Sequence, residues 1–209
     1  MSDQQRIFVV SEEVSLIGEL VSAARRLNRD GDTSIAAVVV GDQTDVRQAG
    51  SYAVDQIYRF EQIPEGYLVE DIFLTLWELV NQQKPAFILI GATTSGRLIC
   101  GRLAARLDIS AITDVRSFEQ LEDGLTARHM IFAGGAERLE RPLRLPVLMS
   151  VARGQFEAEI VQNAKAPEVI TLPFLIPEKR VVLRERKDLT PVSVNLADAK
   201  RVVCLGRGI

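Results

Sequence analysis

Residues 85–97 read PAFILIGATTSGR, and the rest of the fold can be worked out from this junction. A continuous apolar run from Ala86 to Ile90 is bounded by Pro85 and Gly91, which is typical of a strand buried on both faces. A polar loop follows the run, and an amphipathic helical pattern begins directly after that loop. A buried strand that leads straight into a helix predicts one repeat unit of a parallel α/β sheet.

The sequence before this junction repeats the same alternation. Apolar strands are predicted at 7–10, 35–40 and, more weakly, 57–58. Ser11 is expected to cap the first of two helices. Because right-handed crossovers place such helices on both faces of a sheet, the pattern predicts a Rossmann-like three-layer α/β/α fold with a mainly parallel sheet. The helical stripes consist of Leu16, Leu20, Ala24 and Leu27, and of Leu68, Ile72, Leu76 and Leu79.

The second half of the chain has a different pattern. Two predicted strands, at 115–121 and 125–132, lie on either side of Glu122-Asp123-Gly124, and Asp-Gly is a strong hairpin signal. Further strands are expected at 147–151 and 181–185, and no long helical pattern separates them. We therefore expect the second half to extend the sheet with antiparallel strands.

Composition narrows the class of protein. The chain has 209 residues, of which 47% are hydrophobic and 25% are charged, as in folded soluble domains. Its formal net charge is −3, so it lacks the basic surplus of a duplex-binding domain, and we expect no nucleic-acid partner. It has no apolar run of about 18 residues and no signal-peptide pattern. We expect a cytoplasmic protein, or a mitochondrial matrix protein if it is eukaryotic and its presequence has been removed.

The loop after the strand at 86–90 is the best-formed candidate binding site. It leads into a helix N-terminus, where exposed backbone amides attract anions. It is not a P-loop, because Arg97-Leu98 stands where lysine and Ser/Thr would contact phosphate and magnesium. A structural role stays open as the alternative, in which Ser95 caps the helix and Gly91 permits a tight turn. The candidate anion-site residues are Thr93, Thr94, Ser95 and Gly96.

The residues predict neither a catalytic centre nor a metal site. His129 is the only histidine, and we assign it to structure, because one histidine without a Cys-x-x-Cys pair cannot complete a zinc site. Cys100 and Cys204 stand in apolar surroundings, which is typical of reduced thiols in a cytosolic protein. Arg102 and Arg106 form a basic stripe on the helix after the loop, which is either solvated or faces a partner.

The last residues predict the opening of another unit. A strand pattern at 199–205 is followed by Gly206-Arg207-Gly208, as at the start of a dinucleotide-binding unit. Because an isolated strand cannot pair its backbone groups, we expect the chain to be cut at the start of a second domain. Arg207 then lies at the carboxyl end of a strand, where its guanidinium can pair with a pyrophosphate. A flexible arginine at a ragged end is the alternative.

Three segments together resemble the alpha subunit of the electron transfer flavoproteins. The first is 85–97 with the helical residues 103–107 after it. The second is Phe-Ala-Gly-Gly at 132–135, followed by VARGQFEA at 151–158. The third is 194–203, which leads into Gly206-Arg207-Gly208. In this order and at these separations the segments are specific, and the resemblance spans nearly the whole chain.

The resemblance implies a heterodimer of alpha and beta subunits. Such a heterodimer is an electron carrier, not an enzyme, and takes electrons from flavin dehydrogenases to a quinone reductase or another acceptor. The implied domains are an N-terminal nucleotide-binding-like α/β domain at 1–190, and a linker with the first strand of a truncated C-terminal FAD-binding domain at 191–209. The resemblance also implies that Arg207 contacts FAD in the intact protein, and that the other FAD ligands lie outside this chain.

Two expectations concern the isolated chain. We expect it to bind no FAD by itself, because a tight flavin site must bury most of the cofactor. We also expect it to expose apolar surface that a beta subunit covers, and therefore to self-associate.

Two departures from the family pattern indicate a divergent branch. The usual Gly-Asn after the hairpin reads Gly134-Gly135, and the usual Val-Arg-Pro-Gly reads Val151-Ala152-Arg153-Gly154. A hypothesis from a different class also stands on the residues: a stand-alone adenine-nucleotide-binding regulatory module that uses the loop at 91–97.

Overall fold

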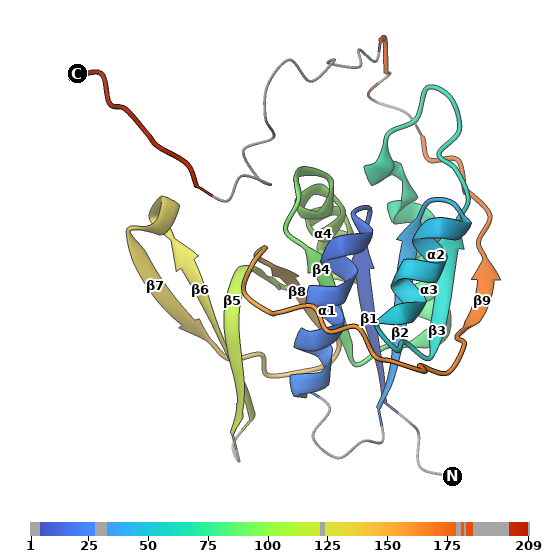
Figure 1. Cartoon of the computed structure of the whole chain (residues 1–209), viewed down its shortest axis with the longest axis horizontal. Helices are drawn as coiled ribbons and strands as arrows, with labels where there is room; N and C mark the ends of the chain where they lie inside the picture. Colours follow the sequence, from blue (N-terminus) through green and yellow to red (C-terminus); the bar gives the residue numbers. More distant parts are fainter. Residues whose placement is uncertain are drawn as a thin grey trace.

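A computed structural model describes residues 5–27, 33–121, 124–178, 181, 183–185 and 201–208. Within these residues, one nine-stranded sheet has the strand order β7-β6-β5-β8-β4-β1-β2-β3-β9 (Figure 1). The strands are β1 (Arg6–Ser11), β2 (Ser34–Val40), β3 (Gln56–Phe60), β4 (Phe87–Gly91), β5 (Ala111–Leu121), β6 (Gly124–Ile131), β7 (Ala136–Glu140), β8 (Val147–Val151) and β9 (Glu168–Thr171). The helices are α1 (Val14–Leu27), α2 (Gln43–Ser51), α3 (Phe73–Gln83) and α4 (Thr94–Leu107), with short 3₁₀ turns at Val69–Ile72 and Phe132–Gly134.

The parallel body of the sheet consists of β8, β4, β1, β2, β3 and β9. β1 lies at its centre, where Val9 pairs with Ala37 of β2 on one side and with Leu89 of β4 on the other. All three side chains are fully buried, because these strands are apolar on both faces and are covered by helices on each. The strands predicted at 7–10, 35–40, 57–58 and 86–90 are confirmed.

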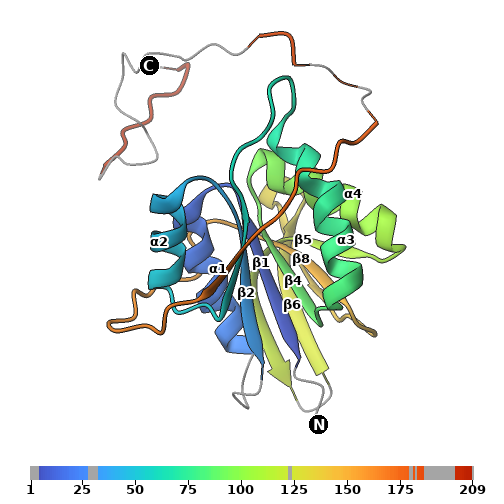
Figure 2. The same ribbon diagram turned by 90° about the vertical axis from the view of Figure 1, so that its right-hand side faces the viewer.

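Two helical layers enclose the parallel body (Figure 2). α1 and α2 pack on one face, where Leu20 of α1 and Ala49 of α2 join the same core cluster. α3 and α4 pack on the other face through Leu76 and Leu103. Each fully buried aliphatic side chain contributes about 1.5–3 kcal/mol relative to an exposed one. The predicted Rossmann-like three-layer α/β/α fold is therefore confirmed.

Three strands form an antiparallel extension at one end of the sheet, which we define as β5–β7 with residues 141–146 after them. β5 pairs with β8 in parallel, and then with β6 in antiparallel orientation; β7 pairs with β6 and lies at the outer edge. The register of β5 shifts next to Asp114, which has a positive φ of 52° and donates its N–H to Ser150 Oγ at 2.9 Å. The predicted hairpin is confirmed, although Glu122 and Asp123 of its turn lie outside the described residues.

The chain between β8 and β9 crosses the outside of α1 (Figure 1). Phe156 is buried there, 5.3 Å from the ring of Phe118 between centroids. Gly18 of α1 permits the crossing, because a Cβ at this position would lie 2.7 Å from the Cβ of Ala158. This path carries the chain from the centre of the sheet to its far edge, where β9 pairs with β3.

Three elements were not predicted: α2, β7 and β9. α2 buries only Val46 and Ala49, so its apolar stripe is too short to stand out in the sequence. β7 and β9 are short edge strands with mostly exposed side chains, and such strands lack the alternating apolar pattern of a half-buried strand. β8, which we expected within an antiparallel region, instead joins the parallel body between β4 and β5.

Two predicted strands are wrong over their described residues; residues 182, 199 and 200 lie outside the described part of the chain. Residues 181 and 183–185 have no strand structure, and 64% of Val181 is exposed. Residues 201–206 also form no strand, and Val203 is 85% exposed. Neither segment pairs with the sheet, and without a neighbouring strand the backbone groups of an apolar run stay solvated.

The predicted helix starts shift slightly. Ser11 ends β1, and its Oγ accepts the N–H of Glu13 at 3.0 Å, so α1 begins only at Val14. α4 is capped by Thr93 and not by Ser95. None of the helices in the described ranges is both long and apolar enough to cross a bilayer.

Candidate functional site at the carboxyl edge of the sheet

The parallel strands end together at one edge, and their connections diverge there. From β1 the chain passes through α1 to β2 on one side, whereas from β4 it passes through α4 to β5 on the other. The crevice between the carboxyl ends of β1 and β4 is therefore the topological switch point of the sheet. Ligands of open α/β sheets bind at this position. We take the groups that line it as the candidate site.

A carboxylate already lies at the helix N-terminus in this crevice. Thr93 Oγ1 accepts the N–H of Gly96 at 2.9 Å and donates to Glu12 Oε1 at 2.7 Å. An anion at the N-terminus of a helix is stabilised by the helix dipole. Glu12 supplies that anion from within the chain, at the place where a phosphate would otherwise bind.

The other oxygen of the same carboxylate has no partner. Glu12 Oε2 is buried and makes no hydrogen bond to any described residue. A buried acceptor without a donor is unfavourable, so this oxygen favours a hydrogen-bond donor or a cation. It does not favour a phosphate, which would repel it.

The glycines of the loop provide close packing rather than room for a ligand. A Cβ on Gly96 would lie 1.9 Å from the carbonyl oxygen of Gly91, and a Cβ on Gly91 would lie 2.4 Å from Leu16 Cδ2. β4, α1 and the first turn of α4 therefore meet at these two residues. Gly91 was expected to permit a tight turn, and its closest constraint is this contact with α1.

The remaining candidate anion-site residues lie among acidic groups. Ser95 Oγ donates to Glu70 Oε2 at 3.4 Å, and Thr94 is exposed. Arg97 donates to Asp114 Oδ1 through Nη2 at 2.7 Å. Thr93, Thr94, Ser95 and Gly96 thus lie together as expected, but their contacts favour the structural role of this loop over anion binding.

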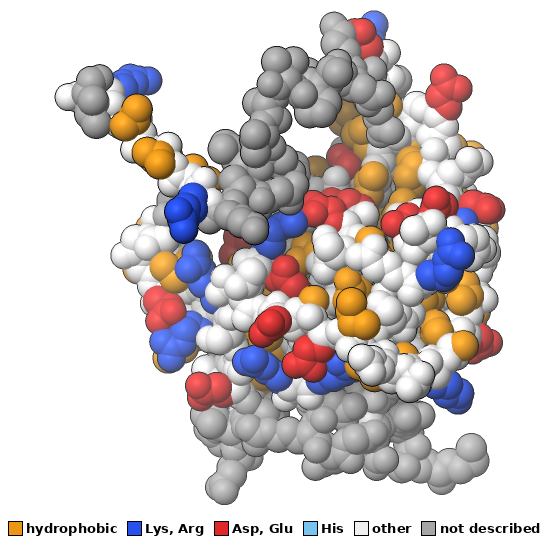
Figure 3. All heavy atoms as spheres, in the orientation of Figure 1, with side chains coloured by type: hydrophobic (Ala, Val, Ile, Leu, Met, Phe, Trp, Pro, Cys, Tyr) orange, Lys and Arg blue, Asp and Glu red, His pale blue; other side chains and the backbone are white. Residues whose placement is uncertain are grey.

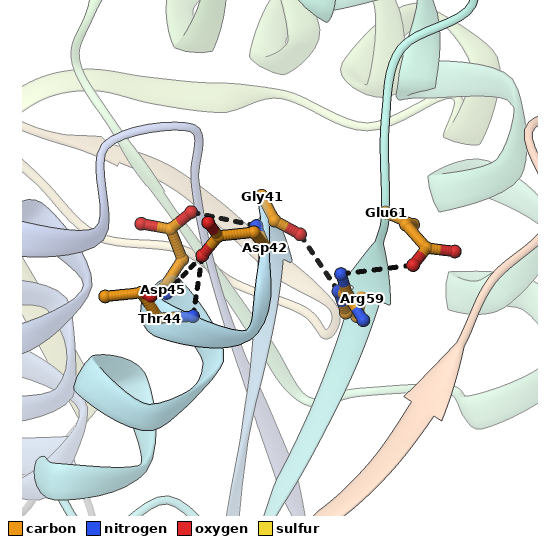
Figure 4. Close-up of polar contacts among 6 residues, drawn as sticks. All are labelled: Gly41, Asp42, Thr44, Asp45, Arg59 and Glu61. Atoms are coloured by element: carbon orange, nitrogen blue, oxygen red, sulfur yellow. Dashed lines mark hydrogen bonds and ion pairs between the residues drawn. The ribbon is translucent and has the colours of Figure 1, made fainter.

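A second polar cluster lies at the carboxyl ends of β2 and β3 (Figure 4). Asp42 accepts the N–H groups of Thr44 at 2.6 Å and Asp45 at 3.3 Å, and Asp45 Oδ2 accepts the N–H of Asp42 at 3.0 Å. This capping box starts α2. The hydrogen bond from Thr44 is the largest of the effects that lower the pKa of Asp42. The spacing Asp-x-x-Asp before a weak helix was the available signal in the sequence.

Arg59 connects this cluster to the next strand. Its side chain is only 7% exposed, and its Nε donates to the carbonyl oxygen of Gly41 at 2.9 Å. Its Nη2 lies 3.4 Å from Glu61 Oε1. The guanidinium therefore holds the ends of β2 and β3 together. Figure 3 shows several acidic side chains in a row across the face of the molecule that α1 and α2 cover in Figure 1.

Residues outside the crevice have structural contacts. Arg102 lies 5.3 Å from the ring centroid of Phe73, and Arg106 lies 4.4 Å from that of Trp77. The basic stripe on α4 thus faces the chain's own aromatic residues on α3, at cation–π distance. Arg106 is also exposed, and the Arg102 side chain is 38% exposed, so the stripe is partly solvated, as one of the two expectations had it.

His129 and the cysteines show no sign of chemistry. His129 is buried in β6 without a hydrogen bond to either ring nitrogen, and its Nε2 lies 3.5 Å from Glu140 Oε1. Burial raises the pKa of the Cys100 thiol to about 12. Cys204 and Arg207 are exposed in the segment 201–208. The described residues contain no group of three metal-ligating side chains.

The fold and this crevice define a doubly wound α/β domain of the nucleotide-binding type, without an evident catalytic centre in its described part. A family model described as "Electron transfer flavoprotein domain" matches residues 15–175. The chain therefore belongs to the electron transfer flavoprotein family, and the resemblance found in the sequence is confirmed. Proteins of this family are flavin-associated electron carriers rather than classical enzymes.

Relatives of known name agree with this assignment. The chain is 26% identical over 213 residues to YdiR of Escherichia coli K12, whose name describes an electron transfer flavoprotein subunit. It is 27% identical over 214 residues to protein FixB of Salmonella typhimurium. These alignments cover 100% of this chain, but only 65% of YdiR and 66% of FixB. The chain thus spans about two thirds of the length of these relatives.

Proposed function

We propose that this chain is the nucleotide-binding-like α/β domain of an electron transfer flavoprotein alpha subunit. In this proposal the whole protein carries electrons from flavin dehydrogenases to a quinone reductase or another acceptor. The observation that carries the proposal is the match of the family model to residues 15–175. The crevice supports it, because its carboxylates, hydroxyls and guanidinium groups bind one another and present no nucleophile with an activating base.

The flavin enters this proposal through residues outside the α/β domain. In the crevice, the carboxylate of Glu12 lies at the N-terminus of α4, and its buried oxygen without a hydrogen bond would repel a phosphate, so the described groups do not fit a pyrophosphate. We propose that residues 1–190 are the α/β domain, and that residues 191–209 lead toward an FAD-binding part in which Arg207 contacts the cofactor. The redox chemistry belongs to the flavin, while the protein positions it and tunes its electrostatics.

The proposed partner is an electron transfer flavoprotein beta subunit, in the cytoplasm or, in a eukaryote, in the mitochondrial matrix. Coexpression with the beta subunit encoded in the same genome tests the pairing. A tag on one chain should recover both in equal amounts. Recovery of the tagged chain alone, at every salt concentration tried, would contradict the proposed partner.

Flavin content tests whether FAD binding requires parts of the protein outside residues 1–209. The chain of residues 1–209 should purify without stoichiometric FAD, because a single exposed arginine contributes about 1.5–3 kcal/mol against roughly 8 kcal/mol for micromolar binding. One equivalent of flavin absorbance would overturn this. In any flavin-loaded preparation that contains the beta subunit, Arg207→Ala should lower the flavin-to-protein ratio. Arg201→Ala, which changes another exposed arginine of the same segment, should not.

Calorimetry with AMP and ATP tests the alternative, a stand-alone adenine-nucleotide-binding regulatory module. We expect no binding at micromolar concentration. Micromolar binding that is lost in Thr94→Ala and Ser95→Ala would favour the alternative instead. These variants are suitable because both side chains are at least partly exposed, whereas a change at Gly96 would disturb the packing of the helix.

A further inference from the structure

β7 is an uncovered edge of the sheet. It pairs with β6 on one side, and no described strand lies on its other side. The exposed fraction is 60% for Leu139, and 61% and 42% for the side chains of Arg138 and Glu137. An edge strand presents a row of backbone N–H and C=O groups to any strand that can align with it. A partner must therefore match both this backbone and the charges beside it.

The charged residues of β7 are complementary to those of β7 in a second copy of the chain. The strand reads Glu137-Arg138-Leu139-Glu140 in its last four residues. Within one chain, Arg138 Nε lies 3.0 Å from Glu140 Oε1. If two copies align in antiparallel orientation about a two-fold axis at Leu139, Arg138 of each copy also lies directly opposite Glu140 of the other, and the two ion pairs join in one cluster of alternating charge. Directly opposite residues share a face of the sheet, and opposite charges in such pairs are stabilising. We propose that two copies of this chain associate through β7 in this register.

Exposed apolar side chains flank the strand at both ends. Phe132 precedes β7 and is 83% exposed, with a positive φ of 52°. Leu143 follows β7 and is 90% exposed. In a dimer with its two-fold axis at Leu139, the start of β7 in one copy lies beside the end of β7 in the other. Phe132 of one copy is therefore brought toward Leu143 of the other. Burial of these side chains adds apolar area to an interface that begins with backbone pairing.

The opposite edge of the sheet lacks this self-complementarity. β9 reads Glu168-Val169-Ile170-Thr171, and Glu168 Oε2 already accepts Gln56 Nε2 at 2.7 Å. It contains no cation that could lie opposite the glutamate of a second copy. β9 therefore serves as the matched control edge.

Charge exchange tests the register. Arg138→Glu leaves acidic residues at both 138 and 140, and Glu140→Arg leaves basic residues at both. In a dimer of either variant, residue 138 of each copy therefore lies opposite a residue 140 of the same charge. We expect the unmodified chain to dimerise in analytical ultracentrifugation at low salt, and each variant to dimerise at least about tenfold more weakly. An equimolar mixture of the two variants restores opposite charges at every pair. Native mass spectrometry should show that the mixture forms heterodimers.

The controls separate pairing from damage to the fold. Leu139→Lys places two cations at the two-fold axis and should abolish the dimer, whereas Val169→Lys on β9 should leave it unchanged. Circular dichroism of every variant establishes that it is folded. The proposal is overturned if the unmodified chain stays monomeric at millimolar concentration, if Leu139→Lys remains a dimer, or if the mixed, folded charge variants fail to associate.

Discussion

The parallel body and the antiparallel extension belong to one sheet but differ in how deeply their strands are buried. In the body, Val9, Ala37 and Leu89 pair across three strands and are all inaccessible to solvent. In the extension, β7 has no buried residue, and Leu143 after it is almost fully exposed. The body is closed by helices on both faces, whereas the extension ends in an open edge. β5 and β6 still contribute Phe118 and Leu125 to the core, so the exposed surface of the extension lies at β7 and the residues after it.

At the junction between the two regions, β5 changes its pairing partner from β8 to β6. Val115 of β5 still pairs with Val151 of β8, at the end of the parallel part, and also with His129 of β6, at the end of the hairpin. Just before it, Asp114 adopts a positive φ, and Arg97 donates to its carboxylate. An irregular residue at this point turns the strand from one partner to the other. The change of partner therefore takes place within a continuous core, because Phe118 of β5 and Leu125 of β6 belong to the same cluster as Val9 and Leu89.

The largest expected contrast is in thiol reactivity. Cys100 belongs to the body, and its pKa of about 12 leaves roughly one thiolate in ten thousand at pH 8. In a Cys204→Ser background, we expect Cys100 to react with a maleimide at least about a thousandfold more slowly than a cysteine introduced as Leu143→Cys in the extension. Mass spectrometry of timed, quenched samples measures both rates. Comparable rates would show that the body opens as readily as the extension.

Truncation of a leucine tests the same contrast in stability. Leu89→Ala removes a fully buried side chain from β4 and should lower the free energy of unfolding by about 2–5 kcal/mol. Leu143→Ala should change it by no more than about 0.5 kcal/mol. Urea unfolding followed by circular dichroism measures both. A loss above 1 kcal/mol for Leu143→Ala would contradict the exposed position of this leucine.

This contrast explains which elements could be predicted from the sequence. β1, β2 and β4 have continuous apolar runs because helices cover both of their faces, and such runs are visible without a structure. β7 and β9 were missed because they lie at the edges of the sheet, where burial imposes no pattern. The strand expected at 199–205 failed for the opposite reason. Val202, Val203 and Leu205 are apolar, but no neighbouring strand pairs with them in the described part of the chain.

The candidate site was only partly visible in the sequence. The loop at 91–97 was recognised, because a glycine after a buried strand and hydroxyls before a helix have a local signature. The position of Glu12 was not predicted, because it follows β1 and reaches Thr93 only through the pairing of β1 with β4. A contact between residues 81 positions apart depends on the register of the sheet. The carboxylate at the start of α4 therefore became visible only in the structure.

A pair of glycines on one helix tests how closely the body is packed. Gly96→Ala places a Cβ 1.9 Å from the carbonyl oxygen of Gly91 and should cost about 1–3 kcal/mol, because the backbone must shift. Gly101, on the same helix, has no atom within 4 Å of an added Cβ. Gly101→Ala should therefore be neutral or stabilise by up to about 1 kcal/mol, since alanine favours the helix. Thermal unfolding of the two variants gives the comparison, and equal effects would contradict the packing described at the crevice.

The smallest effect is expected from an ion pair in the extension. Arg128 Nη1 lies 2.6 Å from Glu137 Oε2, but the two side chains are 45% and 42% exposed. Solvent screens such a pair, so a double-mutant cycle with alanine should give a coupling energy of about 0.5 kcal/mol or less. In the body, Arg102 and Asp71 form a less exposed pair at 3.3 Å, with side chains 38% and 16% exposed.

The salt dependence of the two coupling energies distinguishes the exposed ion pair from the less exposed one. At 1 M salt the Debye length is about 3 Å, so the coupling between Arg128 and Glu137 should fall to the error of the measurement. Arg102 also donates to the carbonyl oxygen of Glu70 and lies over the ring of Phe73, and these contacts hold the guanidinium beside Asp71. The coupling between Arg102 and Asp71 should therefore persist in part. Both cycles are measured at protein concentrations at which the chain is monomeric, because Leu139→Lys would place a cation directly opposite Arg128. If the extension pair kept the larger coupling at 1 M salt, the extension would be more rigid and less solvated than its exposed side chains indicate.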